Sequence, residues 1–145
     1  MKIYLASRYS RREELCRYRS DIIFTGHEVT SRWLDGNHQI SDDGLSALAA
    51  KAERVRFATK DWHDLMAADW CISFTEAPRS SNSRGGRHVE FGAAMAKGLH
   101  CVVIGPRENV FHCLPEVECF DSWEEFYPTL QSPVGHHLHI PQDEP

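Results

Sequence analysis

The sequence predicts a single α/β domain built on a five-stranded parallel sheet with helices on both faces. Short apolar runs alternate with longer stretches in which apolar residues recur at helical spacing. Strands that alternate with helices form parallel sheets, because each helix carries the chain back to the start of the next strand. The length of 145 residues fits one domain, which we expect over residues 1–131, followed by a Pro- and His-rich tail over 132–145.

The first half of the chain holds two predicted strands and two predicted helices. The apolar residues 2–6 form the first strand, and a helical pattern over 10–25 ends where Gly26 can terminate it. Residues 27–33 are predicted to form the second strand. A second helical pattern runs over 41–68, after a polar stretch that ends in N-capping residues.

The second half continues the alternation. A strand predicted at 69–74 is followed by a polar, glycine-containing loop and a helix of small residues over 88–97, which a glycine closes. Strands at 101–104 and 117–120 and a last helix over 122–130 complete the expected elements.

Composition excludes several classes of protein. Lys plus Arg number 16 against 21 Asp plus Glu, a net charge of −5, which argues against a nucleic-acid polymer as partner. No apolar run approaches the ~20 residues that span a bilayer. The five cysteines are widely spaced and form no CxxC pair, so neither a disulfide framework nor a zinc ribbon is expected. We therefore expect a cytoplasmic protein without a membrane partner.

The strongest functional pattern is the segment RGGRHVEFG over residues 84–92. Its glycines, Gly86 among them, let the backbone approach a ligand closely, and the helix that follows offers free N–H groups. Glu90 is predicted to lie in the first helical turn, where the helix dipole favours an ionised carboxylate. Such a carboxylate can act as a nucleophile at a sugar carbon. A plain turn before a favourable first-turn glutamate would give the same pattern.

Asp61 is the second candidate, with Asp64 and Asp69 nearby in the chain. Two carboxylates that converge from different segments suit retaining glycosyl transfer, in which one attacks the sugar and the other handles a proton. A solvated helix face explains the same acidic residues equally well.

Ser7, Arg8 and Tyr9 follow the first strand directly, at a predicted helix start. Ligands of parallel sheets bind beyond the carboxyl ends of the strands, and hydroxyls, helix N–H groups and guanidinium groups together can hold a phosphate. The alternative is a capping serine followed by surface arginines. Neither GxxxxGK[ST] nor GxGxxG occurs, which disfavours a nucleoside triphosphatase and a dinucleotide oxidoreductase.

Three further residues lie in loops at the same edge of the predicted sheet. Trp33 can stack on a base or pack against its own domain. His88 can contact a ligand or satisfy a helix end. Asn109 follows the fourth strand, where a neighbouring subunit can use it.

Three segments resemble the nucleoside 2-deoxyribosyltransferase family, including its relatives that hydrolyse the N-glycosidic bond of nucleoside 5′-monophosphates. Residues 2–6 with the polar turn after them resemble the family's first strand and substrate loop. Residues 61–69 (DWHDLMAAD) resemble its D…AD segment, and residues 86–92 (GRHVEFG) resemble its catalytic G-x-x-x-E-x-G element. The resemblance covers roughly residues 2–120.

The resemblance implies a flavodoxin-like (Rossmann-like) fold and a homo-oligomer whose active sites are completed across subunits. It implies that Glu90 attacks C1′ of a nucleoside or nucleotide and forms a glycosyl-enzyme, that Asp61 assists the departing base, and that Ser7 or Tyr9 contacts the substrate. No metal and no organic cofactor is required.

One departure from the family pattern bears on the substrate. Members that act on free nucleosides usually carry an acidic residue shortly before the glycine element, whereas this chain has Ser83, Arg84 and Arg87 there. Arginines suit a 5′-phosphate, so the sequence favours a nucleoside 5′-monophosphate as the substrate. The same departure argues against transferase activity.

Other functions fit parts of the pattern. A phosphoribohydrolase of the cytokinin-activating type also uses a Gly-Gly loop and a following Glu, but it expects a Thr after the glycines and a second Glu that this chain lacks. A non-catalytic nucleotide-binding or sensing module on the same fold is the alternative from another class. The polar loops at one sheet edge argue against a purely structural protein.

Overall fold

The computed structural model describes residues 1–36, 47–80 and 85–131. Its centre is a five-stranded sheet in the order β2-β1-β3-β4-β5, in which all neighbouring strands pair in parallel. The strands are β1 (Lys2–Ala6), β2 (Glu28–Val29), β3 (Trp70–Phe74), β4 (His100–Ile104) and β5 (Val117–Phe120). This is the flavodoxin-like strand order, and it confirms the predicted fold class.

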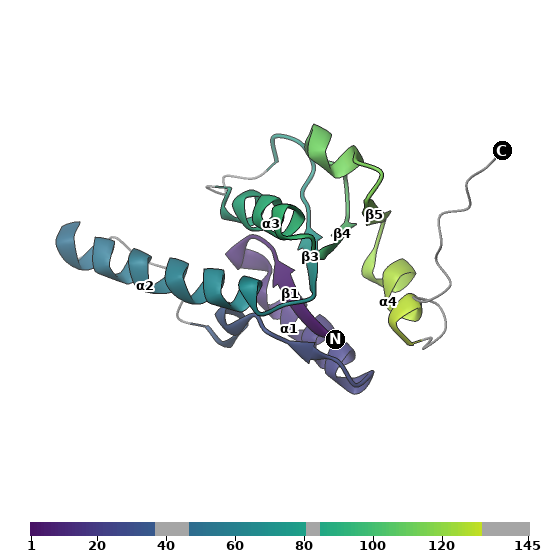
Figure 1. The fold of residues 1–145 in the computed structure, drawn as a ribbon, viewed down its shortest axis with the longest axis horizontal. Helices are drawn as coiled ribbons and strands as arrows, with labels where there is room; N and C mark the ends of the chain where they lie inside the picture. Colours follow the sequence, from purple (N-terminus) through teal and green to yellow (C-terminus); the bar gives the residue numbers. More distant parts are fainter. Residues whose placement is uncertain (37–46, 81–84, 132–145) are drawn as a thin grey trace.

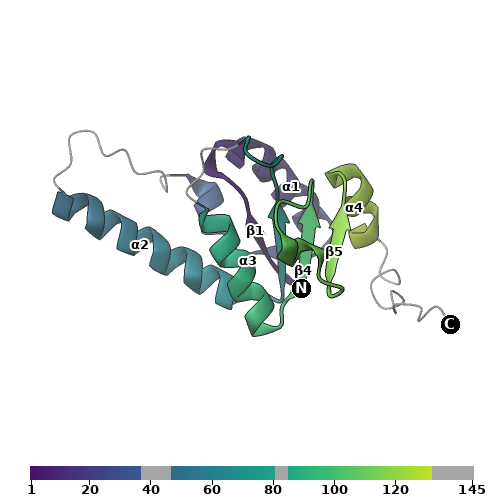
Figure 2. The same ribbon diagram turned by 90° about the horizontal axis from the view of Figure 1, so that it is seen from above.

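In the described part of the chain, four α-helices cover the two faces of this sheet. α1 and α4 pack beside each other on one face, and α2 and α3 on the other (Figures 1 and 2). The connections that the structure describes contain the short 3-10 helices η1, η2 and η3. The α-helices are α1 (Arg12–Phe24), α2 (Ala47–Met66), α3 (Gly86–Lys97) and α4 (Trp123–Gln131). The 3-10 helices are η1 (Tyr9–Arg11), η2 (Arg32–Asp35) and η3 (Val110–Cys113).

Side-chain alternation along the strands separates the two faces chemically. Phe74 of β3 stacks on Tyr18 of α1, with ring centroids 5.4 Å apart, and approaches Trp123 of α4 at 6.1 Å. Because neighbouring strand residues point to opposite faces, Ser73 and Cys71 face α2 and α3 instead. The α1/α4 face is therefore an aromatic core, and the α2/α3 face carries the polar groups described below.

The second strand is much shorter than predicted. The chain was expected to stay extended over 27–33, but β2 ends at Val29 and η2 begins at Arg32. Side chains replace the missing ladder: the Leu5 N–H donates to Ser31 Oγ at 2.7 Å, and the Trp33 indole donates to the Leu5 carbonyl at 2.9 Å. The backbone N–H and carbonyl of Leu5 are thus hydrogen-bonded by side chains, so β1 does not require a longer β2 to pair them.

Several predictions fall on parts of the chain that the structure does not describe. They are the start of the second helix before residue 47, the C-terminal tail at 132–145, and Arg84 with Ser83. Among the described residues, no helix is both long and apolar enough to cross a membrane.

Candidate active site

Three ionisable side chains converge on the α2/α3 face of the sheet. Tyr4 comes from the middle of β1, Asp61 from the last turns of α2, and Glu90 from α3. Tyr4 pairs in register with Cys71 of β3, whose thiol also lies within reach of the Glu90 charge. The two carboxylates that the sequence pointed to are therefore brought together, with a buried tyrosine between them and the sheet.

Burial dominates the electrostatics of Glu90. It raises the pKa of Glu90 from 4.5 to about 7, and the nearby Asp61 charge raises it further, whereas the Tyr4 hydroxyl lowers it. That hydroxyl lies close to Glu90 but outside ordinary hydrogen-bond geometry, and among the described residues it has no other partner. Burial also raises the pKa of Tyr4 well above its usual value, so Tyr4 remains a neutral donor.

The prediction that a helix start keeps Glu90 ionised is wrong. α3 begins at Gly86 rather than at residue 88, so Glu90 lies in the second turn, beyond the N–H groups that favour a negative charge. Loss of water around the carboxylate then decides its pKa. Near neutral pH the Glu90 carboxyl therefore exists in both its protonated and its ionised form.

The other two aspartates near Asp61 have structural partners. Asp64 is buried and accepts hydrogen bonds from the backbone and the side chain of Arg32, which ties α2 to η2. Asp69 accepts the Lys2 N–H at 2.9 Å, at the amino edge of the sheet. Asp61 is thus the carboxylate of this group that lies beside Glu90.

The first loop adopts the predicted place at the carboxyl end of β1. Ser7 Oγ donates to the Arg8 carbonyl at 3.0 Å, and Arg8 Nε donates to Ser10 Oγ at 2.6 Å. The Tyr9 ring lies 6.2 Å from that of Trp33, at an angle of 45°. Ser7, Arg8 and Tyr9 are all half-buried, so they remain accessible in part at this edge.

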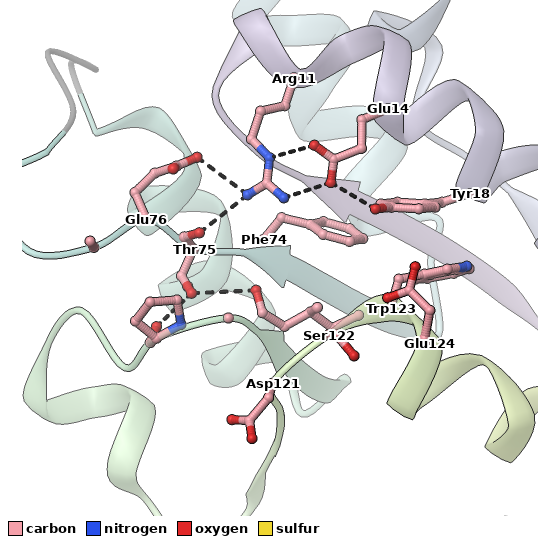
Figure 3. Close-up of a pocket in the computed structure, with 14 residues that line it drawn as sticks. Arg11, Glu14, Tyr18, Phe74, Thr75, Glu76, Asp121, Ser122, Trp123 and Glu124 are labelled. Atoms are coloured by element: carbon pink, nitrogen blue, oxygen red, sulfur yellow. Dashed lines mark hydrogen bonds and ion pairs between the residues drawn. The ribbon is translucent and has the colours of Figure 1, made fainter.

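The following arginine of this loop, Arg11, is not open to a phosphate. Its guanidinium donates to both Glu14 oxygens, to the Thr75 carbonyl and to Glu76 (Figure 3). The cavity of about 380 Å³ beside it is also lined by Asp121 and Glu124. An anion would meet four carboxylates there, so a phosphate site at Arg11 is disfavoured.

Trp33 lies inside the domain. It is 5% exposed, and its indole N–H is committed to the Leu5 carbonyl. Its ring therefore packs against its own domain, one of the two roles considered for it, and it presents little surface on which a base could stack.

The glycine element divides into an exposed part and a buried part. Gly86, the first residue of α3, is exposed, and an added Cβ would meet nothing within 4 Å, which leaves room for a ligand. Arg87 is 5% exposed and pairs with Glu108 at 2.6 Å, so its guanidinium is engaged by the protein rather than open to a substrate. His88 Nε2 lies 3.5 Å from the same carboxylate.

Asn109 caps η3, where its Oδ1 accepts the Phe111 N–H at 3.0 Å. Together with His88 it lines an open cavity of about 600 Å³ on the outer side of α3, whose other walls are apolar. Asn109 is thus separated from the Glu90 cluster by α3 within this chain. No three His, Cys, Asp or Glu side chains of the described residues are grouped to hold a metal ion.

Sequence reasoning missed two residues. Tyr4 is an apolar-strand residue with a polar tip, and its alternation with Ile3 and Leu5 was a usable signal, because it placed the hydroxyl on one face of the sheet. Glu108 sits in an irregular loop, and its pairing with Arg87 depends on how that loop folds over α3.

Comparisons with known proteins bear on the fold. No family model and no curated protein sequence matches the chain. The structure is similar to that of a 2-deoxyribosyltransferase from the psychrotolerant bacterium Bacillus psychrosaccharolyticus, with 18% identity and a TM-score of 0.66 over 90% of this chain and 96% of that one. It is also similar to the CMP N-glycosidase BcmB of Clostridium botulinum, with 17% identity and a TM-score of 0.57 over 91% of this chain and all of that one. The chain thus has the fold of the nucleoside 2-deoxyribosyltransferase family, as the three resembling segments predicted.

Proposed function

We propose that this protein cleaves the N-glycosidic bond of a nucleoside or, preferentially, a nucleoside 5′-monophosphate, with the sugar in its ribo or deoxy form. The observation that supports this best is the convergence of Tyr4, Asp61 and Glu90 on one face of the sheet. The fold is shared with a 2-deoxyribosyltransferase and a CMP N-glycosidase, both of which act on such bonds.

The first step uses Glu90 in its ionised form. One carboxylate oxygen attacks C1′ of the sugar, the C1′–N bond breaks, and the base leaves with the bonding electron pair. The two carboxyls share one proton, and in the reactive form Asp61 carries it while Glu90 is ionised; Asp61 assists that departure by delivering this proton to the base, directly or through a water molecule. The transition state resembles an oxocarbenium ion, whose positive charge the Glu90 carboxylate offsets.

The second step releases the enzyme. Water attacks C1′ of the glycosyl ester, loses a proton to a nearby base, and returns Glu90 to its carboxylate form. If a second base attacks in place of water, the product is a new nucleoside. Whether water or a second base accepts the sugar, all bonds and protons of the reaction are accounted for without a cofactor.

A 5′-phosphate would be held at the carboxyl edge of β1. The first-loop residues Ser7, Arg8 and Tyr9 lie there, next to the N-terminal end of α1. Arg84 remains a candidate partner from the glycine element, whereas Arg87 contributes through its pair with Glu108 and not through the substrate.

A second copy of the chain is the proposed occupant of the apolar outer face of α3. Val89 and Phe111 are 67% and 62% exposed there and line the cavity of about 600 Å³ that includes Asn109. A contiguous exposed apolar patch with a polar rim is typical of an interaction surface. Sedimentation velocity should therefore show an oligomer that Val89→Lys converts to a smaller species; a monomeric wild type would contradict the assembly.

Chromatography tests the activity directly. The protein is incubated with deoxynucleosides, ribonucleosides and their 5′-monophosphates, each with and without a second free base, beside Glu90→Gln and the exposed control Glu53→Gln. Free base released without an acceptor, and lost only in Glu90→Gln, indicates a hydrolase and identifies the substrate. New nucleoside that forms only with an acceptor indicates a transferase. Binding without any product from the folded protein would refute the enzyme and favour a nucleotide-sensing module.

A further inference from the structure

Glu108, in the loop after β4, contacts three elements: its carboxylate binds α3 and the end of β3, and its backbone N–H binds η3. Arg87 Nη2, in the first turn of α3, donates to both of its oxygens at 2.8 and 2.6 Å. The Glu76 N–H, just after β3, donates to Oε1 at 2.7 Å. The Glu108 N–H in turn donates to His112 Nδ1 at 3.0 Å, which fixes the loop on η3.

This junction is buried and charged. The Arg87 and Glu108 side chains are 4% and 12% exposed. Burial alone would raise the pKa of Glu108, but the hydrogen bonds from Arg87 and from the Glu76 N–H outweigh it and hold that pKa below its usual value. Glu108 is therefore an ionised carboxylate that neutralises a buried arginine, an arrangement with strict geometry.

The end of β3 is held from its other side as well. Arg11 of η1 donates to the Thr75 carbonyl and to the Glu76 carboxylate, while Glu14 binds the same guanidinium (Figure 3). The point where the chain leaves β3 toward α3 is thus fixed between two arginine–carboxylate pairs. Of the two, the pair with Glu108 also reaches α3 itself.

We propose that Glu108 is a positioning residue for Glu90, acting through Arg87 and the first turn of α3 without touching the substrate. Arg87 and Glu90 are three residues apart, so they lie on one side of the helix and move together. Glu108 thereby sets how Glu90 faces Tyr4 of β1, Asp61 of α2 and Cys71 of β3, the groups that surround it. This inference rests on the proposed role of Glu90 as the nucleophile.

The effect of positioning a nucleophile can be measured as a change in reaction rate. A nucleophile displaced by about 1 Å can lose roughly 100-fold in rate, because the reacting atoms must be held near the attack distance. Loosening the first turn of α3 would also admit water around Glu90. Its pKa would then fall from about 7 toward the usual glutamate value.

The test uses the full chain and four variants. Glu108→Gln removes the charge and keeps the shape, and Arg87→Met/Glu108→Gln removes the buried unpaired arginine that the single variant leaves. Glu118→Gln is the matched control, because Glu118 pairs with His100 at 2.5 Å at the opposite edge of the sheet. Glu90→Gln identifies the Glu90 signal in carbon-13 carboxyl spectra. The measurements are kcat, KM, the melting temperature and the pKa of Glu90.

In Glu108→Gln we expect kcat to fall at least about 10-fold with KM within about threefold of wild type, and the pKa of Glu90 to drop. The double variant should regain the wild-type melting temperature, but its kcat and its Glu90 pKa should stay low. Glu118→Gln should keep the wild-type kcat and the wild-type Glu90 pKa. A Glu90 pKa that stays near 7, or a kcat that returns with the melting temperature, would overturn the proposal. If the wild type shows no turnover, or if Glu90→Gln retains wild-type turnover, the proposed function is wrong. The Glu90 pKa in Glu108→Gln then decides by itself whether Glu108 positions Glu90.

Discussion

Replacing Glu90 by Gln is expected to stabilise the folded protein at alkaline pH and, under the proposed function, to abolish cleavage of the glycosidic bond. Glu90 has a pKa of about 7 in the fold, against 4.5 for an ordinary glutamate, because burial disfavours its charge. Below pH 4.5 the carboxyl is protonated in both the folded and the unfolded chain and changes nothing. As the pH rises toward 7 the unfolded chain ionises first, so the folded state progressively loses stability through this window and regains none above it.

The size of the effect follows from the two pKa values. At 1.36 kcal/mol per pH unit the loss amounts to about 3 kcal/mol for a fully buried group. Glu90 is only half-buried, so solvent screening reduces this to about 2 kcal/mol. Glutamine has the same shape and no charge, so Glu90→Gln should recover that amount at pH 8.5 and less than about 0.5 kcal/mol at pH 4.5. For a domain of this length this corresponds to a rise in melting temperature of about 6 °C.

Urea unfolding of the wild type and Glu90→Gln at the two pH values measures this difference. Glu53→Gln serves as the control, because Glu53 forms an exposed pair with Arg56 on α2 and should change stability by less than about 0.5 kcal/mol at either pH. A Gln advantage at pH 8.5 no larger than that at pH 4.5 would refute the account of Glu90 as a carboxylate whose charge is desolvated by the fold.

Three further predictions follow from the same geometry. In the proposed mechanism Glu90 attacks in its ionised form, so kcat/KM should fall below about pH 7. Tyr4→Phe should move this limb of the pH profile to higher pH, because it removes the hydroxyl that lowers the Glu90 pKa. Asp61→Asn should move the limb to lower pH, because the like charge that raises the pKa is gone; shifts of the same sign in both variants would contradict the cluster. Gly105→Ala should cost about 2 kcal/mol in urea unfolding, because the residue has φ of +115° and its Cβ would lie 2.7 Å from Thr75 Oγ1; a loss under about 0.5 kcal/mol would contradict this packing.

The fold was largely predictable because it depends on local patterns. Apolar runs marked four of the five strands to within a residue or two, and a glycine at φ +91°, Gly26, follows α1 where it was expected. The second strand was overestimated, because Ser31 and Trp33 bond to the backbone of β1 through their side chains. Such substitutes for a strand ladder leave no trace in periodicity.

The candidate site divides in the same way. Asp61 and Glu90 were identified from motifs, since each stands at a recognisable place in the order of strands and helices. The state of Glu90 was not predictable, because its pKa depends on water excluded by Tyr4 and the sheet. Arg87 was expected to hold a phosphate, but it pairs with Glu108, a residue 21 positions away.

The sequence by itself determined which segments are strands and helices, their parallel arrangement, and the residue types available at one edge of the sheet. These follow from side-chain periodicity and chain connectivity, which act over a few residues. Only the tertiary structure decided which charges are neutralised and which are desolvated. The attraction between Arg87 and Glu108 and the burial of Glu90 beside Tyr4 arise between distant segments, whose approach is set by packing. The charge state and hydration of these side chains therefore depend on the folded structure, whereas the candidate catalytic residues can be identified from the sequence.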